Sequence, residues 1–261
     1  MNDLNRDRAL AGRHAVVTGA SRGIGAAIAR RLAAHGAAVT LLGRDRDALQ
    51  SVAASLGEAR SRVVVADVTD HPEVTRALAE ARQALGPIHL LVNNAGQADS
   101  RPFHKLDDAH WQRMLGVNLS GPCHTMRDAL PDMLEAGFGR VVNVASTAAL
   151  KGYPYVSAYC AAKHGLLGLT RSVALEVARR GITVNAVCPG YTDTELVRAA
   201  VANIRQTTGR SEAEAVEALV AHNPQRRLIQ PEEVAHVVAW LCLPGTESLT
   251  GQAIPVAGGE V

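Results

Sequence analysis

Tyr159 and Lys163 are the residues whose types and spacing point most directly to chemistry. They are four positions apart in a helical stretch, so their side chains share one face of the helix. With four tyrosines and three lysines in 261 residues, chance predicts only about 0.05 pairs of this spacing. A phenol has a pKa of about 10, and a neighbouring ammonium lowers it by stabilising the phenolate. The pair therefore predicts proton transfer to and from a substrate oxygen, with Tyr159 as donor and acceptor and Lys163 tuning it.

A glycine-rich turn lies at the first expected strand-to-helix junction, where residues 18–25 read Thr-Gly-Ala-Ser-Arg-Gly-Ile-Gly. Glycines allow the backbone to turn tightly there, and the amides of the following helix can face a pyrophosphate. The spacing GxxxGxG differs from the common GxGxxG, and the turn lacks the GK[ST] of a P-loop. The turn therefore predicts a dinucleotide cradle.

The elements that must position these residues follow from the hydrophobic pattern. Short runs that are apolar throughout alternate with helical stretches, which is typical of parallel strands buried on both faces. The runs cover residues 14–18, 38–42, 62–66, 89–93, 140–145 and 182–187. This alternation predicts a single α/β domain over residues 1–261, with a doubly wound parallel Rossmann sheet of about seven strands and helices on both faces. Residues 1–10 are expected to be flexible.

Two segments depart from this alternation. Residues 107–136 predict one long helical stretch that is interrupted near Gly121-Pro122. Residues 191–229 have no strand signal and predict two helices, at about 194–204 and 212–222, the second beginning with a capping box of Ser211 and Glu214. A helical pair before the last strand is expected to form a substrate lid, with plain surface decoration as the alternative.

Composition excludes several classes of function. The net charge of +2 and the 3% of aromatic residues argue against a nucleic-acid partner, and no apolar run reaches the ~18 residues of a membrane helix. The N-terminus has no signal-peptide pattern, so a soluble cytoplasmic protein is expected. The four cysteines are far apart and predict reduced, mostly buried thiols. The polar cluster His104, Asp107, Asp108 and His110 is interpreted as a helix start, and no metal is expected.

Together these motifs resemble the short-chain dehydrogenase/reductase family, over residues from about 10 to 259. Residues 18–25 match its TGxxxGxG, residues 93–96 its NNAG, residues 189–194 its PGxxxT, and Gly251 with Gly258-Gly259 its last strand. The resemblance implies an NAD(P)-dependent oxidoreductase acting on a ketone or secondary alcohol. It also implies a homotetramer packed through helices at about 107–136 and 155–180, where the small residues Ala158, Cys160, Ala161 and Ala162 permit close approach.

The family motifs assign residue roles by resemblance. The catalytic residues are Asn118, Ser146, Tyr159 and Lys163, with Ser146 preceding Tyr159 by the family's 13 positions. Ser146 would donate to the substrate oxygen, and Asn118 would hold a water that links Lys163 to solvent. The cofactor residues are Gly19, Ser21, Arg22, Gly23, Ile24, Gly25, Arg44, Asp67, Val68, Asn94, Ala95, Gly96, Tyr159, Lys163, Pro189, Gly190, Thr192 and Thr194. The substrate residues are Gln97, Ser146, Thr147, Tyr153, Tyr155, Tyr159 and Tyr191, although Tyr153 and Tyr155 are equally compatible with packing.

The end of the second strand indicates which nicotinamide is used. NAD-preferring members carry an acidic residue there, whereas this chain has Gly43 followed by Arg44. A guanidinium suits a 2′-phosphate, and Arg22 in the glycine turn is a second phosphate partner. NADP(H) is therefore favoured. NAD(H) is the alternative, because both arginines are also compatible with solvated surface positions and the acidic Asp45 follows Arg44 directly.

The stretch 181–190 and the following insert resemble aromatic-polyketide ketoreductases and hydroxybutyrate-dehydrogenase-like members. This favours reduction of a 3-oxoacyl thioester, of coenzyme A or acyl carrier protein, or of a related 3-oxo compound. Reductases that act on acyl carrier protein use two arginines to dock the carrier. In this chain the second of these positions is Arg180, but the first is Gly137. This difference weakens the prediction of a carrier-bound substrate. The alternatives are an NAD-dependent secondary-alcohol or 3-hydroxyacid dehydrogenase and, more distantly, a non-catalytic dinucleotide sensor.

Overall fold

Seven strands form one parallel sheet in the computed structural model, which describes residues 8–57 and 60–261. The strands are β1 (His14–Thr18), β2 (Ala38–Gly43), β3 (Ser61–Val65), β4 (Leu90–Asn93), β5 (Gly139–Val144), β6 (Ile182–Pro189) and β7 (Ala253–Val256). Their order is β3-β2-β1-β4-β5-β6-β7, so the winding direction reverses between β1 and β4. The six apolar runs are confirmed as strands, because buried parallel strands need apolar residues on both faces.

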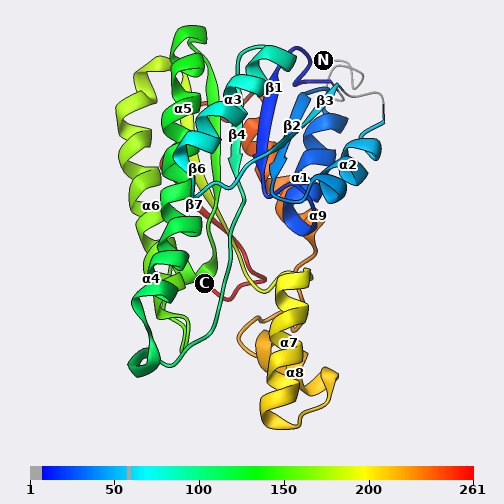
Figure 1. Cartoon of the computed structure of the whole chain (residues 1–261), viewed down its shortest axis with the longest axis vertical. Helices are drawn as coiled ribbons and strands as arrows, with labels where there is room; N and C mark the ends of the chain where they lie inside the picture. The colour runs from blue at the N-terminus through cyan, green and yellow to red at the C-terminus, as the bar shows by residue number, and fades with distance from the viewer. Residues whose placement is uncertain (1–7, 58–59) are drawn as a thin grey trace.

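Helices cover both faces of this sheet (Figure 1). One face packs against α1 (Gly23–Ala34), α2 (Arg46–Ala54) and α9 (Pro231–Cys242), and the other against α3 (His71–Leu85), α5 (Gly121–Ala136) and α6 (Ser157–Val177). Successive strand residues alternate between the two cores: Ala15 and Val17 belong to the first, and Val16 to the second. The predicted doubly wound Rossmann architecture is confirmed.

The long helical stretch is interrupted by one π-helical turn. It consists of α4 (Asp108–Leu115), the π turn η3 (Gly116–Ser120) and α5, so the break falls just before Gly121-Pro122. Pro122 lies in the first turn of α5, where its missing amide proton is tolerated. A π turn widens the helix locally and often marks a functional position. Here it carries Asn118.

The acidic lead-in to α4 acts as a helix cap. The Asp107 carboxylate accepts a 2.7 Å hydrogen bond from the His110 amide, so it satisfies one of the unpaired amides at the helix start. The ring of His110 is buried and lies 3.3 Å from Asp99. Across residues 8–57 and 60–261, no group of three or more histidines, cysteines and acids is placed to hold a metal ion.

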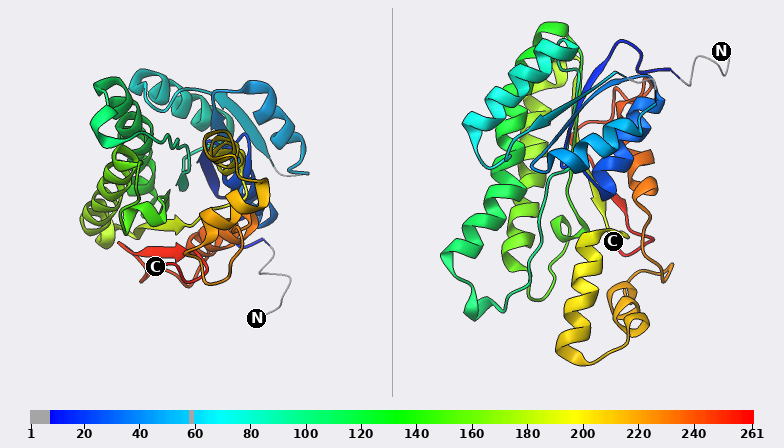
Figure 2. Two further views of the ribbon diagram at one scale, coloured as in Figure 1. Left: turned by 90° about the horizontal axis from the view of Figure 1, so that it is seen from below. Right: turned by 45° about the vertical axis from the view of Figure 1, so that its right-hand side comes forward.

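The segment 191–229 contains a helical hairpin of α7 (Glu195–Thr208) and α8 (Glu212–Val220), which projects from the body below the sheet (Figures 1 and 2). The capping box of Ser211 and Glu214 is confirmed. The hairpin has its own small core around Val197, Val201 and Ala215. Because this core is separate from the sheet, the hairpin can move as a unit, and its role as a lid remains a prediction.

The ends of the chain and the cysteines complete the description. Residues 1–7, most of the segment expected to be flexible, lie outside the described residues. Leu10, the last residue of that segment, is buried in the first core. Cys160, Cys188 and Cys242 are buried free thiols, as predicted, whereas Cys123 is half-buried. Among the described helices, none is both long and apolar enough to cross a membrane.

His14 is a buried titratable residue at the amino end of β1. Its Nδ1 lies 2.8 Å from the Gly86 carbonyl and its Nε2 2.9 Å from the Thr40 hydroxyl. A carbonyl only accepts, so Nδ1 donates to Gly86 and the neutral ring accepts from Thr40. Burial lowers the pKa of His14, chiefly through desolvation. Protonation of this ring in the folded protein is therefore unfavourable.

The folded protein is expected to lose stability as the pH falls below about 6.5, the ordinary pKa of histidine. Below this value the unfolded chain binds a proton at His14 that the folded chain does not, whereas above it the contribution is fully present. The free energy of unfolding in urea should decrease by on the order of 1 kcal/mol between pH 7.5 and pH 5 on account of His14. His14→Gln should make this dependence shallower, and an unchanged slope in the variant would contradict the prediction.

Candidate active site

The turn between β1 and α1 can pack as tightly as it does only because glycine occupies two of its positions. A Cβ on Gly25 would lie 2.2 Å from the Gly19 carbonyl oxygen, and one on Gly19 would lie 2.9 Å from Cα of Ala95. Gly19 also has a φ of +64°, which favours glycine. No side chain caps the start of α1, so its first amides remain available to an anion. These features fit the pyrophosphate of a dinucleotide.

Asn94 holds this turn in place from the end of β4. Its Nδ2 donates to the carbonyls of Thr18 and Gly19 at 3.0 and 3.1 Å. The Thr18 hydroxyl in turn accepts from the amides of Asn94 and Ala95, each at 3.0 Å. The two strands on either side of the reversal point are therefore tied together where the cofactor is expected.

The neighbouring Asn93 points into the sheet and supports it. Its Nδ2 donates to Oδ1 of Asn143 at 2.9 Å, and Asn143 donates to the Thr170 hydroxyl on α6 at 2.8 Å. All three side chains are buried, and satisfied buried networks of this kind fix one packing arrangement.

Both arginines predicted to bind a phosphate are paired with carboxylates. Arg44 follows β2, is 78% exposed, and its Nη1 lies 3.5 Å from Oδ2 of Asp67. Burial opposes ionisation of Asp67, but hydrogen bonds from Thr69 and the Arg44 charge lower its pKa below the ordinary value. Arg22 pairs with Glu195 at the start of α7. Asp45, the acidic residue after Arg44 that kept NAD(H) as an alternative cofactor, caps α2. Its carboxylate accepts a hydrogen bond from the Ala48 amide.

The other predicted cofactor residues lie around the same turn. A hollow of about 400 Å³ beside it is lined in part by Ser21, Arg22 and Gly23. The PGxxxT segment, which follows β6, faces the glycine turn. A Cβ on Gly23 of the turn would lie 3.1 Å from the methyl group of Thr194. Within that segment, which begins with Pro189-Gly190, the Thr192 hydroxyl donates to the Gly190 carbonyl. Ile24 and Val68 pack against the two cores of the sheet.

The four predicted catalytic residues come from three elements and converge. Ser146 follows β5, Tyr159 and Lys163 lie on α6, and Asn118 lies in the π turn. The Ser146 hydroxyl lies close enough to Tyr159 to lower the pKa of its phenol. Lys163 is 3% exposed, and its Nζ lies 5.7 Å from the centre of the Tyr159 ring. Four residues that are up to 45 positions apart therefore form one cluster.

Backbone groups hold Lys163 and Asn118. Nζ of Lys163 donates to the Val144 carbonyl at 2.9 Å. Nδ2 of Asn118 donates to the Gln97 carbonyl at 2.8 Å, and its Oδ1 accepts from the Gln97 amide at 3.2 Å. A Cβ on Gly96 would lie 3.1 Å from this Oδ1 and 3.6 Å from Nζ, so Gly96 separates the two side chains.

Burial affects the protonation of both members of the pair. Burial raises the pKa of Tyr159 to about 12, and the hydrogen bond from Ser146 only partly opposes this. Burial lowers the pKa of Lys163 to about 8. Desolvation thus dominates the pKa of Tyr159, and Nζ of Lys163 is directed to the Val144 carbonyl, so the effect of Lys163 on the phenol pKa stays a prediction. The phenol remains protonated at neutral pH and is ready to donate.

Most of the predicted substrate residues lie near the catalytic cluster, but Tyr155 does not. Thr147, Tyr153 and Tyr191 lie together, with the two aromatic rings edge to face and 6.4 Å between their centres. Gln97 contributes its backbone to Asn118. Tyr155 does not join them: its ring is 66% exposed and its φ is +66°.

Sequence reasoning missed Glu260 near the chain end. Its carboxylate accepts from the Tyr153 hydroxyl and pairs with Lys151. Its only sequence signal is an acidic residue after Gly258-Gly259, and nothing in that pattern indicates the loop it contacts.

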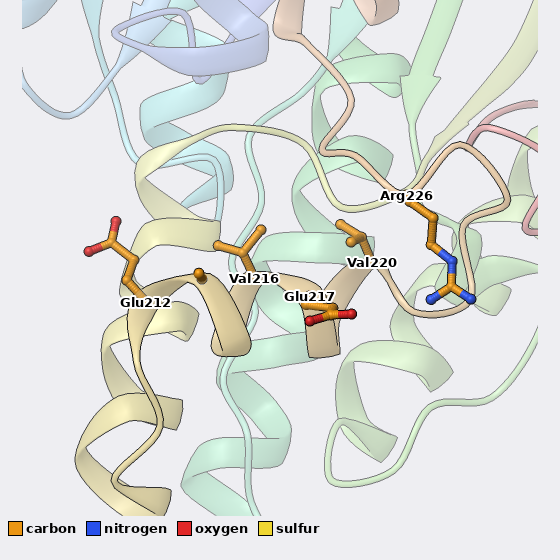
Figure 3. Close-up of a pocket in the computed structure, with 6 residues that line it drawn as sticks. Glu212, Val216, Glu217, Val220 and Arg226 are labelled. Atoms are coloured by element: carbon orange, nitrogen blue, oxygen red, sulfur yellow. The ribbon is translucent and has the colours of Figure 1, made fainter.

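A second hollow lies away from this cluster, on the outer side of the hairpin. Its volume is about 770 Å³, and Figure 3 shows residues of α8 and Arg226 lining it. None of the predicted catalytic, cofactor or substrate residues lines it. The reacting groups are therefore placed at the sheet edge and not on the hairpin.

Comparison with known proteins agrees with the geometry. The family model described as short chain dehydrogenase matches residues 13–205. The chain belongs to the short-chain dehydrogenase family. A D-beta-hydroxybutyrate dehydrogenase of Rhizobium meliloti is 38% identical, covering 94% of this chain and 97% of the relative. An acetoacetyl-CoA reductase of the same organism is also 38% identical, covering 95% and 98%.

Solved structures give the same result. A variant of actinorhodin polyketide ketoreductase with NADPH superposes with a TM-score of 0.90 at 38% identity, covering 95% of this chain and 97% of that one. This short-chain dehydrogenase is therefore an oxidoreductase of a family that binds NAD(P) and acts on hydroxy or keto substrates.

Tyr159→Phe is expected to remove nearly all turnover while leaving cofactor binding close to that of the wild type. The change keeps the ring and removes only the hydroxyl with its proton. Initial rates and fluorescence titration with NADPH measure the two quantities. Turnover within tenfold of the wild type would exclude Tyr159 as the proton donor.

The rate of reduction is expected to fall above about pH 8, where Lys163 loses its proton. Tyr159 does not titrate in this range, so the decrease in kcat/KM should follow one proton. Lys163→Arg keeps the charge at high pH and should remove the decrease, although its activity will be lower. A profile that stays flat from pH 7 to 10 in the wild type would show that charge on Lys163 is not needed.

Proposed function

We propose that the chain is an NADPH-dependent ketoreductase that reduces a 3-oxoacyl thioester or a related 3-oxo compound. The observation that carries the proposal is the convergence of Tyr159, Lys163 and Asn118 beside Ser146 at the carboxyl edge of the sheet. A protonated phenol can give a proton to a carbonyl oxygen, whereas oxidation of an alcohol needs the phenolate.

The roles of the residues follow from their contacts. When bound, the nicotinamide supplies a hydride to the carbonyl carbon. Ser146 donates to the carbonyl oxygen, and Tyr159 gives that oxygen its proton. The resulting phenolate is stabilised by the Lys163 ammonium, held at 2.9 Å from the Val144 carbonyl. Asn118, fixed to the backbone of Gln97, places its Oδ1 beside Gly96 and Lys163, where a water can return the proton.

The preference for NADPH rests on the end of β2. No acid follows Gly43 there to bind ribose hydroxyls, and Asp45 is occupied as the cap of α2. Arg44 is exposed beside Asp67, and a 2′-phosphate can replace this partly exposed carboxylate as its partner. Arg22 lines the adjacent hollow and is a second phosphate contact. The alternative is that Arg22 and Arg44 are solvated surface residues that bind no phosphate.

The substrate class rests on the relatives and on the helix ends. The relatives include an acetoacetyl-CoA reductase and a polyketide ketoreductase by name. Gly137 ends α5 with a φ of +60°, a position that favours glycine over arginine, and Arg180 donates to the Leu134 carbonyl. The two-arginine pattern for docking a carrier protein is thus incomplete, which favours a coenzyme A ester or a free ketone. Tyr153 and Tyr191 supply an aromatic wall, and the segment 191–229 serves as the lid.

A second candidate is an NAD-dependent 3-hydroxyacid dehydrogenase working towards oxidation. The similarity to a D-beta-hydroxybutyrate dehydrogenase supports it. The two candidates share the same four catalytic residues and differ in cofactor and direction. Measured rates distinguish them.

We also propose a cytoplasmic homotetramer that packs through α5 and α6. Its support is an open stripe on α6, where Ala161 and Leu175 are exposed, the latter at 83%, and no atom lies near the missing side chain of Gly168. The prediction that Ala158, Cys160 and Ala162 permit close packing between subunits is wrong, because all three are buried within this chain.

The proposal predicts that kcat/KM for acetoacetyl-CoA reduction is at least about tenfold higher with NADPH than with NADH, on the scale of one charge-assisted contact. Arg44→Gln removes the charge next to the 2′-phosphate, so it should lower the NADPH value about tenfold and leave the NADH value within about twofold. Initial rates at 340 nm measure all four values.

Arg62→Gln provides a matched control, because Arg62 pairs with Glu80 on the surface at β3. It should leave both values unchanged. A preference for NADH, together with faster oxidation of 3-hydroxybutyrate than reduction of acetoacetyl-CoA, would replace the proposal with the second candidate.

A further inference from the structure

The last five residues pass between the exit of the hairpin and the loop that follows β5. Gly258 and Gly259 have φ values of +62° and +94°, which lead the chain back towards the body. A Cβ on Gly258 would lie 2.2 Å from Oδ1 of Asn223, and one on Gly259 would lie 3.2 Å from Pro224. The tail is therefore pressed against the exit of the hairpin.

The Glu260 carboxylate is buried at the far end of this tail. Its side chain is 2% exposed, and its Oε1 lies 3.0 Å from Nζ of Lys151. The same oxygen accepts from the Tyr153 hydroxyl. A Cβ on Gly190 would lie 3.4 Å from its other oxygen, Oε2. A buried carboxylate is costly unless it is paired and hydrogen-bonded, so these partners hold Glu260 in one position.

A chain of hydrogen bonds runs from Glu260 to the residue next to Ser146. The phenol of Tyr153 has one proton and donates it to the carboxylate, and its oxygen lies 2.8 Å from the Thr147 hydroxyl, from which it can accept. Nζ of Lys151 lies 5.1 Å from the centre of the Tyr153 ring. Glu260 thus fixes three side chains of the loop 147–153, on which Tyr153 faces Tyr191.

The reacting groups do not depend on these contacts. The Ser146 hydroxyl accepts from the Ala148 amide, while Lys163 is held by the Val144 carbonyl. Removing Glu260 would therefore loosen one wall of the substrate site without moving the proton donor. A loss confined to positioning of this wall weakens binding more than the chemical step.

We propose that Glu260 is a positioning residue for the substrate: through Tyr153 and Lys151 it fixes the wall that the ketone contacts and thereby sets KM. The inference rests on the proposed function in that it assumes a ketone bound beside Ser146. It assumes neither NADPH nor a thioester.

The test compares Glu260→Ala and Glu260→Gln with the wild type. Glu260→Ala should raise KM for acetoacetyl-CoA about tenfold or more while kcat stays within about threefold. The Kd for NADPH should stay within about twofold, because no cofactor contact changes. Glu260→Gln should have a smaller effect, since its amide oxygen still accepts from Tyr153 but leaves Lys151 unpaired.

Further variants separate positioning from general damage. Tyr153→Phe keeps the ring and removes the hydroxyl, so its effect on KM should be similar and should not add to that of Glu260→Gln. Glu80→Gln makes the same change in a surface pair with Arg62 and should leave KM unchanged. An unchanged KM in Glu260→Ala, or a joint loss of folding, NADPH binding and kcat in both Glu260 variants, would overturn the proposal.

Hydrogen exchange of the segment 147–156 provides a readout that needs no turnover. Glu260→Ala should speed exchange of this segment about tenfold, and exchange at the wild-type rate would overturn the inference. A wild-type enzyme that reduces other ketones but no 3-oxo compound would contradict the proposed function alone. KM would then be compared on the ketone that it reduces.

Discussion

Seven parallel strands place all their carboxyl ends along one edge of the sheet, and every part of the site depends on this geometry. The glycine turn follows β1, Arg44 follows β2 and Asp67 follows β3. The later strands contribute in the same way, with Asn94 after β4, Ser146 after β5, the PGxxxT segment after β6 and Glu260 after β7. The reversal of winding between β1 and β4 leaves a crevice for the dinucleotide, and the side-chain amide of Asn94 ties the two strands there.

Burial at this edge determines the chemistry of its ionisable groups. Desolvation raises the pKa of Tyr159 to about 12 and lowers that of Lys163 to about 8, so each group is displaced towards its neutral form. The Glu260 side chain is 2% exposed and contacts Lys151 and the Tyr153 hydroxyl. The same low-polarity surroundings thus give a neutral proton donor in one place and a rigid ion pair in another. The difference lies in whether an opposite charge is in contact.

Ion pairs and hydrogen bonds between distant segments link the hairpin and the chain end to this edge. Arg22 in the glycine turn contacts Glu195 at the start of α7, 173 positions later in the sequence. Glu260 contacts Tyr153, 107 positions earlier. Arg22 therefore joins the glycine turn to the segment after β6, and Glu260 joins the loop after β5 to the chain end after β7. These contacts also explain why two residues predicted for ligand binding, Arg22 and Tyr153, already have protein partners.

Local patterns in the sequence determined the strands, the helix starts, the glycine turn and the Tyr159–Lys163 pair, whereas Asn118 and Ser146 were assigned by resemblance to the family. Apolar runs, the spacing of four and the capping residues are properties of neighbouring positions, so they can be identified without knowing the fold. Only the tertiary structure decided the raised pKa of Tyr159, because desolvation depends on what packs around the ring. It alone turned Ala158 and Ala162 inwards, left Tyr155 in solvent and brought Glu260 to Tyr153. Such contacts join segments a hundred residues apart, and no local pattern carries the information that pairs them.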